Sequence, residues 1–269
     1  MSMRPQLLSA FVFIALLAAP HFATAQVEII EPEDRSPGIV KIARGTTECR
    51  EPSRDNARCA TEYWTLYFHA DGSRYIHVVS DNMRFGQARH AMVWVDPKGE
   101  TREAYINTWT KDGVIGSAYV VKREDSVDVA ASDLRFERAG EGMIREEVKA
   151  LARLDSIGVG PAAADGLHFL HYDFDAAGRQ PHGIYWMGGT LHGTMVGVIA
   201  LSQYTYLGEE EITIADGKTF LADKFEMVSG TKVWLTKEDR ILLRMDLVFG
   251  AAYGSIFETV SLDIAEVGI

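Results

Sequence analysis

The chain contains little cysteine and little proline, and it is short of positive charge. Of its 269 residues, two are cysteine and eight are proline. Two cysteines cannot by themselves form a structural zinc site. The 27 lysine and arginine residues are outnumbered by 38 aspartate and glutamate residues, which gives a formal net charge of −11. Because binding to phosphate groups needs a basic stripe and the sequence has none, this composition argues against nucleic acid as a partner.

Motifs for nucleophilic and nucleotide chemistry are also missing. A nucleophile elbow needs Gly-x-Ser-x-Gly between a strand and a helix, and the chain has no such pattern. The glycine-rich stretches 113–116 and 188–193 lack the Lys-Ser/Thr pair and the βαβ setting of a phosphate loop. We therefore expect no nucleotide and no other cofactor.

The first 25 residues have the three parts of a secretory signal peptide. Arg4 lies in a short basic head, an apolar run covers residues 7–19, and Ala23-Thr24-Ala25 precedes Gln26. This order indicates cleavage after Ala25, and the apolar run is short for a membrane span. We therefore expect an exported protein, periplasmic or secreted, with no membrane span in its mature chain.

The two cysteines, Cys49 and Cys59, both follow the expected cleavage site. An even pair in an exported protein usually cross-links, so we expect a disulfide that closes the polar loop 50–58. In the chain-entropy treatment, closing such a loop stabilises the fold by about 3 kcal/mol.

Short runs rich in aromatic and β-branched residues, separated by turn signals, cover most of the chain. The clearest signal is Asp71-Gly72, which lies between residues 63–69 and 74–79 and predicts a β-hairpin. A two-residue turn there would place two sets of side chains on one face: Trp64, Leu66 and Phe68 with Tyr75, His77 and Val79. Further turns are expected at residues 96–99, 112–113 and 123–126, with Trp109 opposite Gly116.

Consecutive hairpins favour an up-and-down antiparallel sheet. Ile144, Val148 and Leu151 recur at helical spacing and predict a helix over residues 141–155. The expected fold class is mainly β, with a curved antiparallel sheet or sheets, half-barrel or two-lobed and barrel-like, and at most one substantial helix. Residues 26–269 would form a single domain, or two lobes at about 38–140 and 186–264 joined by that helix and a Gly/His-rich connector.

The stretch Gly208–Leu262 has the most regular meander pattern. If Ser229-Gly230 and Glu238-Asp239 are its turn centres, cross-strand counting places Phe225, Trp234 and Leu243 side by side on one apolar face, which continues through Met245.

This stretch contains Gly208-Glu-Glu-Glu-Ile-Thr-Ile-Ala-Asp-Gly-Lys-Thr-Phe-Leu-Ala, followed by Val-Trp-Leu and Leu-Leu-Arg-Met. It resembles the C-terminal half of bacterial exported domains of the lipoprotein-carrier kind and of their uncharacterised relatives. The resemblance implies a strongly curved antiparallel sheet that wraps like a half-barrel around a lipid-like or other hydrophobic ligand. It supplies no catalytic residue.

The leading hypothesis is an exported protein that binds a hydrophobic small molecule or lipid in a β-sheet cavity. One helix offers little cover for an apolar sheet, so part of the apolar face should stay open to a ligand. The expected binding residues are Trp64, Phe68, Phe225, Trp234, Leu243 and Met245. A purely structural envelope protein, a further alternative, would have no enclosed pocket.

The other alternative is a cofactor-independent lyase, isomerase or hydratase that acts on a hydrophobic terpenoid, steroid or aromatic substrate. His77 lies on an apolar strand near Tyr75, and a desolvated imidazole beside an aromatic hydroxyl can act as a general acid or base. A core histidine satisfied by backbone or by tyrosine is the plainer interpretation. His77→Ala separates the two functions, because it would abolish turnover by an enzyme and leave the affinity of a binding protein nearly intact.

The connector 162–197 is rich in histidine. His168, His171 and Asp173 are metal-ligand types, but His168 and His171 share a face only in a helix. The flanking residues favour extended chain, in which these two side chains point to opposite sides. We therefore expect no metal site.

Overall fold

The computed structural model describes residues 38–84, 86–133, 144–150, 153–187, 196–249 and 253–267, so the expected signal peptide lies outside the described residues. The strands are β1 (Ile39–Glu51), β2 (Ala57–His69), β3 (Arg74–Asn82), β4 (Gln87–Val95), β5 (Thr101–Thr110), β6 (Gly113–Lys122), β7 (Ser126–Asp133), β8 (Ile144–Lys149), β9 (Ser156–Gly158), β10 (Arg179–Trp186), β11 (Val198–Thr213), β12 (Thr219–Met227), β13 (Lys232–Thr236), β14 (Leu242–Phe249) and β15 (Tyr253–Glu266). Two 3-10 helices, η2 (Pro52–Arg54) and η3 (Ala162–His171), complete the described elements.

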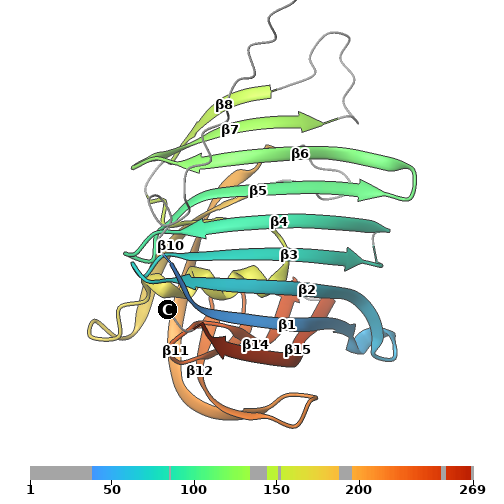
Figure 1. Ribbon diagram of the computed structural model, residues 1–269, viewed down its shortest axis with the longest axis vertical. Helices are drawn as coiled ribbons and strands as arrows, with labels where there is room; N and C mark the ends of the chain where they lie inside the picture. The colour runs from blue at the N-terminus through green and yellow to red at the C-terminus, as the bar shows by residue number, and fades with distance from the viewer. Residues whose placement is uncertain are drawn as a thin grey trace, which may run out of the picture. The chain divides into compact units, whose positions relative to one another are not determined.

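All of these strands belong to one sheet, in the order β8-β7-β6-β5-β4-β3-β2-β1-β15-β14-β13-β12-β11-β10-β9. Two up-and-down runs therefore extend in opposite directions from the central pair of β1 and β15. Every neighbouring pair is antiparallel except β9 and β10. Figure 1 shows the strands from β8 to β1 as a ladder, with β10 to β12 crossing behind it. The mainly β, antiparallel prediction is confirmed, and the curved sheet is not closed into a barrel.

The strands alternate between an inward and an outward face. In β4, for example, Ala91, Val93 and Val95 are buried while Trp94 is exposed. This alternation is the period of two that extended chain imposes. Apolar side chains from β2 to β7 thus form a continuous inward layer.

Helix η3 covers the inward face of the sheet. It contacts β2, β3, β9 and β14, and Figure 1 shows it in yellow behind β2 and β3. Its Ala163 and Leu167 join the larger core cluster, and its Phe169 joins a second cluster. The side chains expected to bind ligand are accordingly covered by protein, with exposed fractions from 0 % for Phe225 to 7 % for Phe68.

The turn between β2 and β3 differs from the prediction by one residue. At the β2–β3 turn, His69 N–H donates to the Ser73 carbonyl at 3.0 Å, and Gly72 has φ +88°. This three-residue loop pairs Thr65 with His77 and Tyr67 with Tyr75. The shared face predicted for Trp64 and His77 is therefore wrong, because a shift of one residue moves side chains to the other face. His77 and Tyr75 point outward with Tyr63, Thr65 and Tyr67, and Trp64 points inward.

The β12–β13 turn shows the same difference. Met227 N–H donates to the Thr231 carbonyl at 2.8 Å, so Phe225 lies opposite Val233 and Lys224 lies opposite Trp234. The apolar face predicted to unite four residues is therefore divided. Phe225 and Met245 pack in the cluster beneath η3, and Trp234 and Leu243 belong to the larger cluster. At the β5–β6 hairpin, Trp109 lies opposite Val114, and Gly116 lies opposite Thr108.

The helix predicted over residues 141–155 is wrong. Of its described residues, 144–149 form strand β8, where Val148 pairs with Val127, and residues 150 and 153–155 belong to neither helix nor strand. Spacing of four residues also suits alternate positions of a strand, and pairing with β7 decides between the two. The longer described helix, η3, lies in the segment predicted to be irregular.

Two further predictions concern the covalent structure and the membrane. Cys49 and Cys59 form the expected disulfide, with their Cα atoms 5.1 Å apart. Within the described residues, no helix combines the length and the apolar character that crossing a membrane requires.

Candidate functional site

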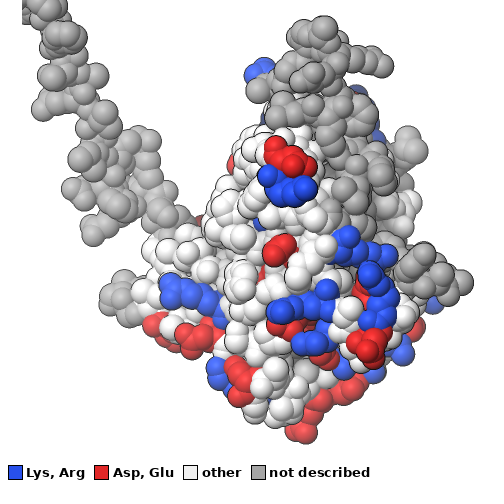
Figure 2. Space-filling model, turned by 90° about the vertical axis from the view of Figure 1, so that its right-hand side faces the viewer, with Lys and Arg blue, Asp and Glu red and all other residues white. Residues whose placement is uncertain are grey.

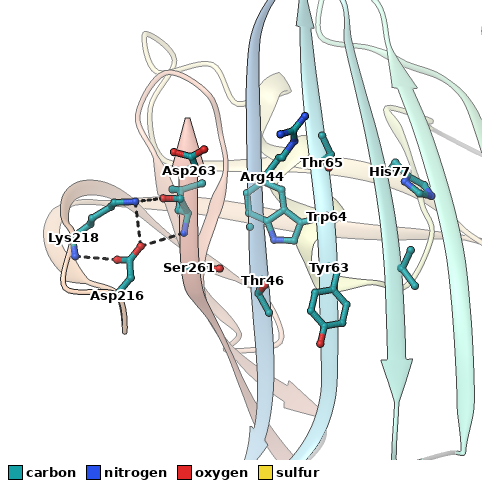
Figure 3. A pocket seen from close by; sticks show the side chains of 13 residues that line it. Arg44, Thr46, Tyr63, Trp64, Thr65, His77, Asp216, Lys218, Ser261 and Asp263 are labelled. Carbon is teal, nitrogen blue, oxygen red and sulfur yellow. Dashed lines mark hydrogen bonds and ion pairs between the residues drawn. The ribbon is translucent and has the colours of Figure 1, made fainter. Parts of the chain in front are cut away.

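A groove of about 560 Å³ lies on the outward surface where β1, β2, β3 and β15 meet the β11–β12 turn (Figure 3). Two rows of side chains cross these four strands. In one row Asp263, Arg44, Thr65 and His77 are direct cross-strand neighbours, and in the other Ser261, Thr46, Tyr63 and Val79 are. The central positions of the rows are Arg44 and Thr65 in the first and Thr46 and Tyr63 in the second, so each threonine lies beside a larger side chain.

On β1, Gly45 lies between the two rows. It pairs with Trp64 on β2 and with Leu262 on β15. A Cβ at Gly45 would lie only 2.3 Å from the indole of Trp64, so this position requires glycine. The indole Nε1 donates to Thr47 Oγ1 at 3.1 Å. Trp64 is thereby fixed across the inward side of the groove's central strand.

One side of the groove is formed by the β11–β12 turn. β14 pairs with β15 only up to Glu258, so Leu262 has backbone groups free on that side. The Asp216 carboxylate accepts from Leu262 N–H at 3.4 Å, and the Lys218 ammonium donates to the Leu262 carbonyl. Asp216 also accepts from its own turn at Lys218 N–H. These contacts hold the turn against β15, as Figure 3 shows.

The charges of the groove are unevenly satisfied. Lys218 is paired with Asp216 at 3.3 Å. Arg44 is exposed, and no interaction joins it to the other residues drawn in Figure 3. Figure 2 shows one face of the molecule, on which Lys and Arg side chains are interspersed with Asp and Glu. Charge on that face is therefore mixed in sign. In the groove, Lys218 is already paired, so Arg44 is the cation that is available to a ligand.

His77 is the imidazole among the residues that line the groove. Its Nε2 lies 3.0 Å from Nε2 of His90, and burial together with His90 lowers the pKa of His77 below its ordinary value. His77 is thus neutral at neutral pH. Tyr75 lies two residues along the same face, where its hydroxyl contacts the sulfur of Met92, and burial raises its pKa.

The structure brings together only part of the predicted site. His77 lines the groove and Trp64 closes it from the inward side, while Phe68, Phe225, Leu243 and Met245 are buried elsewhere. Trp234 is also buried, with Lys224 over its ring and its Nε1 donating to Glu210 at 3.1 Å. Sequence reasoning missed Arg44, Asp216 and Asp263. The only sequence signal for Arg44 and Asp263 was a place on strands, which the pairing of β1 with β15 brings together, and Asp216 was visible only as part of an Asp-Gly turn.

The histidines of the connector do share a face, contrary to prediction. A 3-10 helix has about three residues per turn, so Asp165, His168 and His171 line one side of η3. They face His182 on β10, whose ring centroid lies 6.2 Å from that of His168 and 5.7 Å from that of His171. His182 Nε2 lies 2.9 Å from Ser156 Oγ.

Asp173 is exposed and is not part of this cluster. Its carboxylate accepts from Asp175 N–H at 2.9 Å and stabilises a turn. In the described parts of the chain, no three His, Cys, Asp or Glu side chains are arranged to hold a metal ion.

Comparison with known proteins gives a likeness of architecture. No family model matches the chain, and no curated protein matches it. A crystal structure of a β-barrel-like protein of a domain of unknown function, DUF1849, from Brucella abortus is similar over 86 % of this chain and 100 % of that chain, with a TM-score of 0.51 and 6 % identity.

The likeness is one of fold. The resemblance to uncharacterised β-barrel-like relatives, expected from residues 208–262, is confirmed at that level. A DUF1089 family protein from Pseudomonas aeruginosa covers 70 % of this chain and 90 % of its own, with 14 % identity and a TM-score of 0.44. A putative outer membrane lipoprotein-sorting protein domain from Vibrio parahaemolyticus covers 87 % and 88 %, with 9 % identity and a TM-score of 0.20. These two likenesses are too slight to support an inference about this chain.

Proposed function

We propose that this protein is an exported binding protein that holds a small amphipathic molecule in the groove between β1, β2, β3 and β15. The observation that supports it best is the hollow of about 560 Å³, a typical size for a small-molecule site, in which exposed Arg44 lies among aromatic and hydroxyl side chains.

The chemistry of the groove indicates the class of ligand. Tyr63 and Val79 offer an apolar surface, and Arg44 offers five N–H donors in a planar fork that suits a carboxylate or a phosphate. Asp263 is the direct neighbour of Arg44 and would repel a second negative group. A molecule with one anionic group and an apolar body therefore fits best.

The inward face is a weaker candidate in the folded state. Phe225 and Met245 pack beneath η3, so a ligand could reach them only if η3 moved. Their role in binding stays a prediction. Export is supported by the Cys49–Cys59 disulfide, because disulfides persist in oxidising compartments.

The first test is binding of decanoate, an anionic amphiphile, measured by calorimetry against decanol, which has the same chain without the charge. We expect Arg44→Ala to weaken decanoate binding about tenfold and to leave decanol binding unchanged, since a hydrogen bond to a charged group is lost. Arg50→Ala, an exposed arginine of the same strand outside the groove, is the matched control. Failure of the wild-type protein to bind either probe would contradict the proposal.

Native mass spectrometry of the exported protein should identify the natural ligand that co-purifies with it. The same spectrum should show a chain that begins at Gln26. A chain that retains the first residues would contradict the export part of the proposal and leave the groove to be tested by calorimetry.

A second candidate function is the cofactor-independent enzyme for a hydrophobic substrate. It is favoured by the 3.0 Å contact between His77 and His90 at the groove, which could pass a proton between the two rings. His77→Ala would then abolish turnover of a substrate identified by mass spectrometry. Under the binding function, neither the wild-type protein nor His77→Ala would convert that molecule.

A further inference from the structure

The histidine cluster beneath η3 is poorly satisfied by its surroundings. Both ring nitrogens of His168, Nε2 of His171 and the hydroxyl of Tyr204 are buried without a protein hydrogen-bond partner in the described residues. Buried polar groups usually have such partners, and each exception needs a physical explanation.

Few charges near the cluster could balance added protons. Asp155 Oδ2 lies 3.7 Å from Nδ1 of His182, but the same oxygen is already paired with Arg153 at 2.5 Å and accepts from Gly183 N–H at 2.7 Å. On the other side, Glu100 is paired with Lys122 at 3.4 Å. These two carboxylates therefore have little charge left to offer His182 and His171.

Asp165 is the remaining carboxylate. Its Oδ1 lies 3.5 Å from Nε2 of His168 and can balance one protonated ring. Other titratable or charged groups on neighbouring elements are Tyr204 on β11, which faces His182, and Glu62 on β2, which interacts with Asp165 and with Arg89 of β4. A second proton on the cluster would therefore be repelled by the first protonated ring, and no unpaired carboxylate among these groups would balance its charge.

We propose that η3 is an acid-released cover, displaced from the inward face of the sheet when the histidine cluster gains more than one proton. η3 carries two of the three rings, whereas His182 lies on β10, which is hydrogen-bonded to β9 and β11 on its two sides. Repulsion among the rings is therefore relieved by movement of η3.

The attachment of η3 is suited to such release. A 3-10 helix has poorer hydrogen-bond geometry than an α-helix and gains little from its own backbone. Its first N–H groups are held by Glu62 of β2, through bonds of 3.0 Å to Ala162 and 2.8 Å to Ala163. Displacement would expose the apolar cluster of Phe225, Val233, Leu235, Leu242 and Met245 on which η3 packs.

Protonation and displacement are thermodynamically linked. Burial lowers the pKa of His171 and of His182, so the covered state binds protons less readily than a state in which these rings reach water. Through these two rings, a fall in pH below the ordinary histidine value of 6.5 favours the uncovered state. Glu62, whose pKa burial raises to about 7, acts in the opposite direction, so release requires the effect of the histidines to exceed that of Glu62.

The first experiment compares the wild-type protein with His171→Gln/His182→Gln between neutral pH and about pH 5. Fluorescence of the uncharged dye N-phenylnaphthylamine reports apolar surface, and far-ultraviolet circular dichroism reports the sheet. We expect a severalfold rise in dye fluorescence in the wild-type protein with an unchanged β spectrum, and no rise in the double variant. His69→Gln, on the β2–β3 turn, should respond as the wild type does.

A second experiment locks η3 to the β4–β5 turn. A Cβ at Gly99 would lie 3.3 Å from Cβ of Leu170, close to the separation across a disulfide. The oxidised form of Gly99→Cys/Leu170→Cys should lose the dye response, and reduction should restore it. Because Gly99 has φ +83°, oxidised and reduced forms of the same variant are compared, with reduced wild type as the control.

The proposal is overturned if the wild-type protein shows no dye response, if the glutamine double variant responds as strongly as the wild type, or if the oxidised lock responds as strongly as its reduced form. A dye response that accompanies loss of the β spectrum would also overturn it, because global unfolding and not release of η3 would then be the cause.

Discussion

At the scale of single residues, Glu62 is a buried carboxylate that joins β2 to η3. It is buried on β2, and its two carboxylate oxygens accept separate N–H groups at the start of η3. Those N–H groups have no partner within the helix. Burial raises the pKa of Glu62 to about 7, against an ordinary value of 4.5.

The first prediction concerns Glu62→Gln. Because the folded state holds the Glu62 proton more tightly than the unfolded state, this group's contribution is fully present below pH 4.5 and is lost as the pH rises to about 7. The free energy of unfolding of the wild type, relative to that of the variant, should fall across this range by roughly 3 kcal/mol at most. His171 and His182 act with the opposite sign but are common to both proteins. Urea unfolding at a series of pH values measures the difference, and a difference independent of pH would contradict the raised pKa.

At the scale of elements, the hairpins could be predicted and their registers could not. Asp-Gly and Ser-Gly correctly indicated where strands reverse. The same dipeptides suit a two-residue turn and a three-residue loop whose last residue is a glycine with positive φ. Gly72, Gly99, Gly217 and Gly230 all adopt the second arrangement, with φ between +83° and +88°. The faces deduced from two-residue turns at residues 71–72 and 229–230 were therefore inverted on one strand.

Helix η3 was missed for a related reason. Its polar residues recur every three positions, a period that the search for amphipathic α-helices at 3.6 residues does not detect. Its buried residues, among them Ala163, Leu167 and Phe169, face two different parts of the sheet. Tertiary packing and not local preference thus forms this helix.

The second prediction concerns the turn that protects the edge of β15. In Asp216→Ala the amide of Leu262 loses its carboxylate acceptor, so its hydrogen exchange should become severalfold faster. Asp71→Ala is the matched control, because Asp71 accepts from Ser73 N–H in a turn of the same kind that does not touch β15. Exchange measured by NMR should separate the two variants. Equal rates at Leu262 would show that the turn does not protect this edge.

At the scale of the whole molecule, the site depends on which strands become neighbours. Trp64 and His77 could be found because they lie in a recognisable hairpin. Arg44 and Asp263 lie on strands at opposite ends of the sequence, and only the pairing of β1 with β15 brings them into one row. No local pattern in a single sequence states that pairing.

The third prediction concerns the disulfide, which ties the end of β1 to the start of β2. Cys49 and Cys59 are buried in a small cluster with Ala60. Cys49→Ala/Cys59→Ala should lower the free energy of unfolding by about 3 kcal/mol, through the greater freedom of the unfolded chain. Urea unfolding of oxidised wild type, reduced wild type and the variant measures this loss. Equal midpoints for the oxidised wild type and the variant would contradict it.

The pairing of β1 with β15 also bears on how the chain reaches its folded state. β1 is synthesised among the first of the strands and β15 is the last, so their ladder cannot form until nearly all of the sheet is available. Contacts between such distant segments form slowly, because a long loop must close first. Until then β1 and β14 each have an open edge that can pair with another chain. A chain that crosses a membrane before folding would thus stay unfolded during passage, and a fragment without residues 253–267 would be prone to aggregate.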